Sequence, residues 1–309
     1  MNVMRRFFLL FLLLATLLLT SSIAAVNQAQ TQNQSNYFLE IQGIAWDQTT
    51  INILVITPNN ESWWSPIYAN SALRAIGQWN DALQNFAANY SDYTYLYNLK
   101  LQPTVSNVSV TGFDIYLNWT DSPLKKSSNE IALETSTILD NAIIDCYISL
   151  AAHTNHGDAL TDGDMQNIAL HELGHSLGLG HSNYTGDVMY PVYTLLSPSK
   201  YVSTLDVYGV ATTFAWMSNA VSFYPVNQWL QNTPVTLPPN ILYKNLPVST
   251  QNSAPQTLAN NPVIETLTLM FDILIHPEIL AIVIVFIVIL IIIAIVSSKR
   301  KKQMPKVDS

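Results

Sequence analysis

The sequence has 309 residues, a formal net charge of −8 and a single cysteine. Seven of its 13 Lys and Arg residues lie in the two terminal segments, and the six between them are too few and too scattered to build a basic face, which argues against a nucleic-acid partner. One cysteine excludes an intramolecular disulfide framework and a CxxC-type metal site.

The first 25 residues have the pattern of a secretory signal peptide. Arg5 and Arg6 precede an apolar run over 7–19, and small residues suited to cleavage follow at 22–25. A spanning helix needs about 20 apolar residues, so the shorter run favours a signal peptide over the alternative, an uncleaved N-terminal anchor. The Gln-rich segment 26–42 has no amphipathic pattern, and we expect a flexible lead-in there.

A single domain is predicted over 43–218, and its first elements are a strand and a helix. The apolar run 51–56 is typical of a short buried strand. Ser65 and Pro66 form a helix start, with Ser as the cap and Pro in the first turn. Apolar residues then recur every three or four positions as far as Phe86, as they do on the buried face of a helix.

The second half of this domain is predicted to hold strands followed by two helices. Alternating apolar side chains indicate strands over 95–101, 113–117 and 144–150. Thr161 is expected to cap a helix that carries Asp164 in its first turn and runs to about Leu177. A last helix is expected from Thr204, because apolar residues again share one face there.

The C-terminal part is predicted to be a stalk and a membrane anchor. Periodicity fades and prolines accumulate, so we expect a Pro-rich, extended stalk over 219–277. Residues 279–296 carry no polar side chain and span roughly 27 Å as a helix, which predicts a transmembrane helix over 278–297. The basic residues that follow predict a cytoplasmic tail over 298–309 and an extracellular domain.

The residues that carry chemistry lie in the segment HELGHSLGLGH, residues 171–181. His171 and His175 are four positions apart and so project from one face of a helix, where two imidazoles can share one Zn²⁺. Glu172 lies one residue round the helix, where it reaches a metal-bound water rather than the metal. Gly178 can adopt a positive φ and turn the chain back, so that His181 supplies a third nitrogen.

This spacing predicts a catalytic rather than a structural zinc site, because three protein ligands leave a fourth position for water. Zn²⁺ would lower the pKa of that water toward ~7, and Glu172 would take its proton and deliver it to the leaving amine. Three histidines on a solvated surface helix are the simplest alternative, which the complete HExxHxxGxxH spacing disfavours. A site that binds metal without turnover is the second alternative.

The segment HELGHSLGLGHS resembles the zinc-binding consensus of the metzincin metallopeptidases. Ser182, directly after the third histidine, resembles the matrixin branch, the matrix metalloproteinases. Met189 lies within VMYPVY, which is similar to the matrixin Met-turn, a hydrophobic base under the metal. The resemblance implies an α+β, zincin-like fold: a mixed twisted sheet with an active-site helix and a C-terminal helix. It also implies that Pro191 and Tyr193 wall the S1′ specificity pocket.

Other features of the matrixins are not matched residue by residue. The lead-in contains no cysteine and Cys146 is expected to be buried in a strand, so latency through a propeptide cysteine is not expected. A second, structural Zn²⁺ and Ca²⁺ sites are left open. The loop polars and helix-start carboxylates that precede the active-site helix are their candidate ligands, although helix-dipole stabilisation explains the carboxylates more simply: His153, His156, Asp158, Asp162 and Asp164.

The sequence as a whole predicts a single-pass membrane protein whose extracellular domain is a zinc endopeptidase acting on polypeptides. The resemblance implies that the substrate lies along an edge strand, for which 130–135 is the candidate. One alternative is a membrane-anchored zinc-binding surface or adhesion module without turnover. The other is a secreted structural protein whose tail is merely an anchor.

Overall fold

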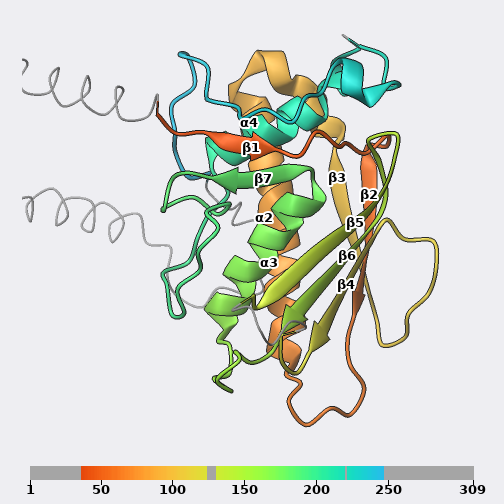
Figure 1. Ribbon diagram of the computed structural model, residues 1–309, viewed down its shortest axis with the longest axis vertical. Helices are drawn as coiled ribbons and strands as arrows, with labels where there is room; N and C mark the ends of the chain where they lie inside the picture. Colours follow the sequence, from red (N-terminus) through yellow and green to blue (C-terminus); the bar gives the residue numbers. More distant parts are fainter. Residues whose placement is uncertain (1–35, 124–129, 220, 247–309) are drawn as a thin grey trace, which may run out of the picture. The chain divides into compact units, whose positions relative to one another are not determined.

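The computed structural model describes residues 36–123, 130–219 and 221–246 (Figure 1). The predicted signal peptide, the transmembrane helix and the basic tail lie outside these residues, as do most of the lead-in and the latter part of the stalk. Among the residues described, no helix combines the length and apolar content that crossing a bilayer requires.

A mixed five-stranded sheet forms the centre of the domain, with the order β3-β2-β4-β6-β5. Four strands run parallel, and β5 pairs antiparallel with β6 at one edge. A separate two-stranded antiparallel sheet joins β1 to β7. The strands are β1 (Leu39–Ile41), β2 (Thr50–Ile56), β3 (Lys100–Ser106), β4 (Ile115–Thr120), β5 (Ala132–Leu139), β6 (Ala142–Ala151) and β7 (Leu179–Ser182).

In the part of the chain that the structure describes, three α-helices accompany the sheet: α2 (Pro66–Asn89), α3 (Asp162–Ser176) and α4 (Thr204–Thr213). Figure 1 shows α2 and α3 running alongside the sheet, and α4 next to β1. Thr161 caps α3 and exchanges hydrogen bonds with Asp164, and Ser203 caps α4 in the same way. The expected helices and the mixed sheet are thus present and make an α+β domain.

The cap of α2 and the contact between α2 and α3 add detail to the sequence prediction. Ser65 occupies the cap position with an extended backbone, but its side chain makes no capping hydrogen bond. Trp79, fully buried on α2, donates its indole N–H to the Leu170 carbonyl of α3 at 3.0 Å. Trp46 donates in the same way to the Ser176 carbonyl at 2.8 Å, at the C-terminal end of α3. These contacts fix the helix segment that holds the histidine motif.

Two of the three predicted strands after α2 need correction. Residues 91–98 form the 3₁₀-helix η1 (Ser91–Asn98) rather than the start of a strand, because the buried Leu96 and Leu99 follow the three-residue spacing of such a helix. In β6 the alternation fails at Ile144, which is 48% exposed. The register against β5 shifts beside it, as at a bulge, so the inward position passes to Ile143.

The domain boundaries also differ from the predicted ones. Leu39 and Ile41, in the predicted lead-in, are buried as part of β1. The segment over 221–246, predicted as stalk, packs back onto the domain, where four of its apolar side chains are buried: Val226, Leu230, Ile241 and Leu246. Its periodicity fades because it buries single apolar residues between turns instead of building a helix or strand. The described domain therefore extends from β1 to Leu246.

Candidate metal centre and active site

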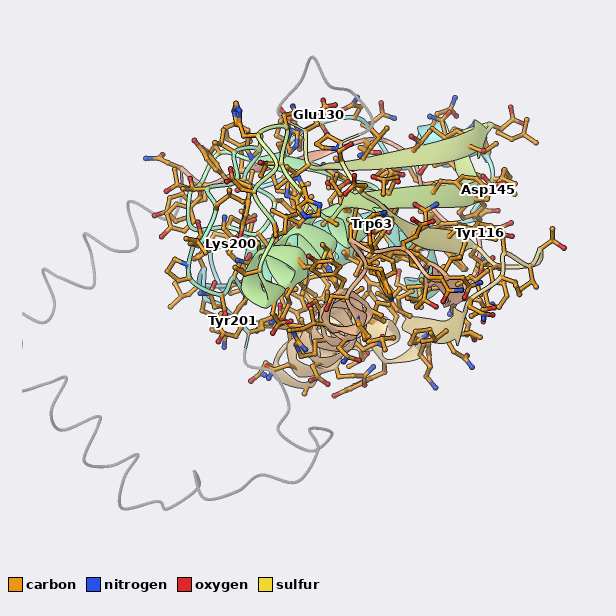
Figure 2. The ribbon with its side chains drawn as sticks, turned by 90° about the horizontal axis from the view of Figure 1, so that it is seen from below. Trp63, Tyr116, Glu130, Asp145, Lys200 and Tyr201 are labelled. Carbon is orange, nitrogen blue, oxygen red and sulfur yellow. The ribbon has the colours of Figure 1, made fainter. Side chains whose placement is uncertain are left out.

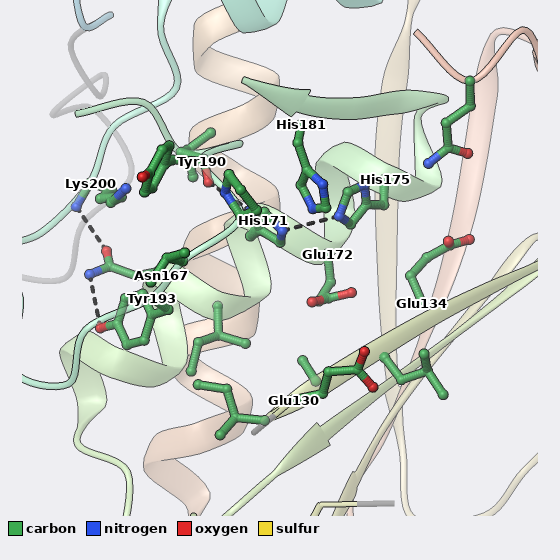
Figure 3. Close-up of a pocket in the computed structure, with 18 residues that line it drawn as sticks. Glu130, Glu134, Asn167, His171, Glu172, His175, His181, Tyr190, Tyr193 and Lys200 are labelled. Atoms are coloured by element: carbon green, nitrogen blue, oxygen red, sulfur yellow. Dashed lines mark hydrogen bonds between the residues drawn. The ribbon is translucent and has the colours of Figure 1, made fainter. Parts of the chain in front are cut away.

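Helix α3 and strand β7 bring the three motif histidines together. His171 and His175 lie one turn apart on α3, and Gly178 follows the helix with φ of +87°. A Cβ at Gly178 would lie 2.6 Å from the Ile44 carbonyl oxygen, so glycine is required at this turn. The turn leads into β7 and places His181 opposite the helix. One ring nitrogen from each histidine lies within 4.8 Å of the others (Figure 3).

Two of the rings are held with their Nε2 atoms facing the same point. His171 Nδ1 lies 2.8 Å from the Val188 carbonyl oxygen, and His175 Nδ1 lies 2.9 Å from the Leu179 carbonyl oxygen. A carbonyl oxygen only accepts, so each Nδ1 carries the proton and each Nε2 has a free lone pair. The two Nε2 atoms are 3.0 Å apart. Two acceptors this close repel each other unless a cation lies between them, which fits a Zn²⁺ ligand pair.

Burial keeps the three imidazoles in the neutral form that binds a metal. Burial, followed by the nearby His175 ring, lowers the pKa of His171 to about 3. Burial is also the main cause of the lowered pKa of His175 and of His181. Neutral imidazole is the ligand form, so no proton has to be displaced at neutral pH before a metal binds. The donor set therefore fits a zinc ion.

Glu172 lies beside the triad and is almost completely buried, with 7% of its surface exposed. Burial raises the pKa of its carboxyl to about 8, and the carboxylates of Glu134 and Glu130 add to the effect. Figure 3 shows Glu172 below His171 and His175, on the side that faces β5. A cation on the histidines would favour the ionised carboxylate, and so would act against the effect of burial on this pKa.

Met189 packs directly beneath the motif. It is fully buried, and its backbone carbonyl accepts a hydrogen bond from the Ser182 N–H at 2.9 Å. A Cβ added at Gly174, which lies between the two α3 histidines, would overlap the Met189 sulfur. Gly174 is thus required for the close approach of the methionine to the helix. The motif spacing indicates Met189, but it does not indicate this reason for the glycine.

An open cleft of about 650 Å³ passes the triad and Glu172. The expected edge strand forms one wall, since the stretch from Glu130 to Glu134 leads into and begins β5, the edge of the sheet. Pro191 and Tyr193, which the resemblance assigns to the S1′ pocket, both line this cleft. The Tyr193 hydroxyl donates to Asp164 at 2.7 Å, which ties this wall to the start of α3.

The far end of the cleft holds a cationic side chain, Lys200. Lys200 lines the cleft, and its ammonium donates to the Asp187 and Thr185 carbonyl oxygens at 2.5 and 3.3 Å. Burial lowers its pKa. In Figure 2, Lys200 and Tyr201 lie on the side of the molecule away from Tyr116 and Asp145. No sequence signal distinguishes this lysine from a surface lysine.

The other candidate ligands do not form a second cluster. His153 Nδ1 lies 3.0 Å from an Asp121 carboxylate oxygen, whereas Asp162 pairs with Arg74 and Asp164 completes the α3 cap. Within 36–123, 130–219 and 221–246, the histidine triad is the one group of three or more potential metal ligands. Cys146 is buried as predicted, and its thiol donates to Glu134 at 3.0 Å.

Comparison with known proteins identifies the type of domain. The matrixin family profile (Peptidase_M10) matches residues 100–215. Matrilysin of Homo sapiens is 39% identical over 75 residues, which cover 22% of this chain and 28% of the relative. Macrophage metalloelastase of Rattus norvegicus is 44% identical over 48 residues (15% and 10%). Matrix metalloproteinase-18 of Xenopus laevis is 26% identical over 195 residues (54% and 41%).

These similarities, together with the site geometry, support a metzincin-type domain over the matched residues. More narrowly, they support a matrixin-like metzincin catalytic domain, the domain type of zinc metallopeptidases. The chain spans less than half the length of each of these three relatives. The matched profile begins at β3 and ends just after α4, so the segment over 221–246 lies beyond it.

Proposed function

We propose that this chain is a zinc-dependent endopeptidase that hydrolyses peptide bonds of extracellular polypeptides. In this proposal His171, His175 and His181 are the zinc ligands, and Glu172 is the catalytic acid and base. The observation that carries the proposal is the convergence of three neutral imidazoles beside a buried carboxyl in an open cleft. Similarity to the matrixins supports the same reaction class.

Each wall of the cleft contributes to the proposed reaction. A bound Zn²⁺ would polarise the scissile carbonyl and lower the pKa of a water molecule. Glu172 accepts a proton from the attacking water and passes it to the leaving amine. The free edge of β5 pairs with the main chain of an extended substrate, and Pro191 and Tyr193 contact the side chain after the cleaved bond. Met189 and Gly174 support the helix from below.

The proposed location is outside the cell, with a membrane anchor near the C-terminus. The sequence pattern supports this: a signal peptide over 1–25, an apolar segment over 278–297 and a basic tail over 298–309. A tag placed at each end of the mature chain tests the topology. In intact cells the tag before residue 36 is expected to react with antibody, and the C-terminal tag only after permeabilisation. Labelling of both tags in intact cells would contradict the anchor.

The activity is tested with the full chain, Zn²⁺ and an unfolded protein as substrate. We expect cleavage that a zinc chelator abolishes and that added Zn²⁺ restores. Glu172→Ala and Glu172→Gln are expected to lower kcat by about 10²–10⁴-fold while zinc stays bound, because proton transfer is lost and the three ligands remain. A wild-type chain that binds zinc but is no faster than Glu172→Ala would instead favour a zinc-binding module without turnover.

A further inference from the structure

The C-terminal strap, which we define as residues 226–246, reaches the back of the Met-turn. It crosses β1, where Val235 and Leu39 exchange backbone hydrogen bonds of 2.9 and 2.8 Å. It ends at the start of α4, where the Thr204 N–H donates to the Lys244 carbonyl at 2.9 Å. Between these anchors the strap presents Tyr243 to the domain. The Tyr243 ring packs edge-on against Tyr37 and Tyr184, with ring centroids 5.3 and 5.0 Å apart.

The hydroxyl of Tyr243 meets the carboxylate of Asp187, which is completely buried. Asp187 accepts hydrogen bonds from three separate segments. Tyr243 donates at 3.1 Å from the strap, and the Ser203 hydroxyl donates at 2.9 Å from the start of α4. The third donor is the Met189 N–H, at 3.0 Å, from the Met-turn itself. The buried Asp187 carboxyl, which also lies beside the buried Asp206 carboxyl, holds its three donors in one arrangement, because the loss of a donor leaves a buried polar group without its partner.

Asp187 is connected to His171, a proposed metal ligand, through the peptide group between Val188 and Met189. The N–H of this peptide group donates to Asp187, and its carbonyl oxygen, that of Val188, accepts the Nδ1 proton of His171 at 2.8 Å. The carboxylate therefore fixes the amide that follows Val188, and the Val188 carbonyl fixes the His171 ring. Hydrogen-bond partners of this kind set the tautomer and orientation of a ligating histidine. His175 differs, since its partner is the Leu179 carbonyl of β7.

We propose that Tyr243 and Asp187 are positioning residues for the metal site. Through them the C-terminal strap holds the Met-turn, and the Met-turn holds His171 in the orientation that binds the metal. The inference rests on the proposed function, because it presumes a zinc ion on the triad. It adds a segment outside the matched matrixin profile to the parts on which the site depends.

The test is the Zn²⁺ dissociation constant of the full chain, measured by competition with a chelating dye. Asp187→Ala removes the acceptor for all three donors and is expected to weaken zinc binding by about 10–100-fold. Tyr243→Phe removes one donor and keeps the ring, so a smaller loss of about threefold to tenfold is expected. Asp187→Asn keeps an acceptor for the Met189 N–H and is expected to recover most of the affinity that Asp187→Ala loses.

Two controls separate positioning from general loss of stability. Tyr224→Phe makes the same change at a tyrosine that is 51% exposed, and its zinc affinity should equal that of the wild type. Leu230→Ala removes a buried side chain of the strap well before Tyr243, and it should lower the free energy of unfolding without weakening zinc binding. Equal zinc affinity in Tyr243→Phe and wild type would overturn the inference, as would an equal loss in Leu230→Ala and Tyr243→Phe.

Failure of the inference and failure of the proposed function give different results. A wild-type chain that binds zinc but cleaves nothing would contradict the proposed peptidase, while the zinc affinities of the variants would still test the positioning role. A wild-type chain that cleaves its substrate, with unchanged zinc affinity in Asp187→Ala, would contradict the positioning role alone.

Discussion

The sequence specifies two parts of the proposed metal site in opposite ways. One is the helix-and-turn segment with the proposed ligands, and the other is the strap that we propose supports them. His171, His175 and His181 lie within 11 residues, and one helical turn followed by one glycine turn brings them together. Asp187, in contrast, draws its donors from Met189, two positions away, and from positions 16 and 56 residues further along the chain. Ligand placement is therefore local, whereas ligand support comes from distant segments.

This difference shows where substitutions should act. Substitutions within residues 171–181 should weaken metal binding or disrupt the glycine turn directly, whether or not the strap is intact. Changes in the strap should act first on the stability of the domain, and on the metal only through Asp187. Both kinds of effect can be measured on the same chain, by zinc affinity and by the free energy of unfolding.

The largest effect is expected from removing the strap. A chain that ends at Ser218 loses four buried apolar side chains of the segment 221–246, each worth about 1.5–3 kcal/mol, and exposes the partner Leu39. The summed loss is comparable with the free energy of unfolding of a whole domain, about 5–15 kcal/mol. The shortened chain should therefore be unfolded at 25 °C, as measured by circular dichroism. A chain that ends at Leu246 is the control and should unfold like the full chain. Equal stability of the two would contradict the packing of the strap.

The next effect tests the local segment. His175→Ala removes one of the three proposed ligands and is expected to weaken zinc binding by more than about 100-fold, which exceeds the loss expected from any supporting residue. Bound zinc per chain, measured by elemental analysis after dialysis, checks the prediction. His156→Ala is the matched control, since His156 is exposed and lies outside the triad. Equal zinc retention in the two variants would show that the triad is not the metal site.

The turn between the second and third ligands should give an intermediate effect. Gly178→Ala forces a Cβ into the left-handed region and against the Ile44 carbonyl oxygen, and should cost about 1–3 kcal/mol in urea unfolding. Gly77→Ala is the control: it lies inside α2, an added Cβ there has nothing within 4 Å, and about 0.5–1 kcal/mol of stabilisation is expected. If both variants matched the wild type, the turn would not require glycine.

The same contrast explains which features could be predicted from the sequence. The capped helix α3 and the triad spacing follow from local patterns, and the structure contains both. The edge strand is expected over 130–135 only from the resemblance, and the structure has it as β5 over Ala132–Leu139. The strand expected over 95–101 begins only at Lys100, because tertiary packing of Leu96 and Leu99 favours a 3₁₀-helix in the residues before it. Periodicity does not distinguish these alternatives in so short a segment.

The long-range features could not be predicted from patterns of this kind. The strap buries single residues between prolines and turns, so it has no periodicity to detect, and the sequence therefore predicts a stalk there. The hydrogen bond between Tyr243 and Asp187 joins residues 56 positions apart, and a tyrosine in a Pro-rich segment gives no indication of such a partner. Lys200 lines the cleft because of the path of the long loop between β7 and α4, and no local sequence pattern predicts that path.

The smallest expected effect is a pH dependence at the start of α3. Burial alone would raise the pKa of Asp164, but hydrogen bonds from Thr161, Tyr193 and the Leu196 N–H outweigh it and lower the pKa. A lowered pKa in the folded state stabilises the fold above the unfolded-state value of about 3.9, and this contribution is lost as the pH falls through the folded-state value. The contribution should therefore be complete above about pH 5 and decrease below about pH 4.

Asp164→Asn removes this titration while it keeps a side-chain acceptor for the cap. Measured by urea unfolding of the metal-free chain, the stability lost between pH 6 and pH 3.5 should be smaller in the variant by about 0.5–1 kcal/mol. Asp47→Asn, at an exposed carboxylate, should lose as much as the wild type. Asp164 also accepts the hydrogen bond of Tyr193, which lines the cleft. If Asp164→Asn showed the same pH dependence of stability as the wild type, the ionised carboxylate of Asp164 would not stabilise this side of the cleft.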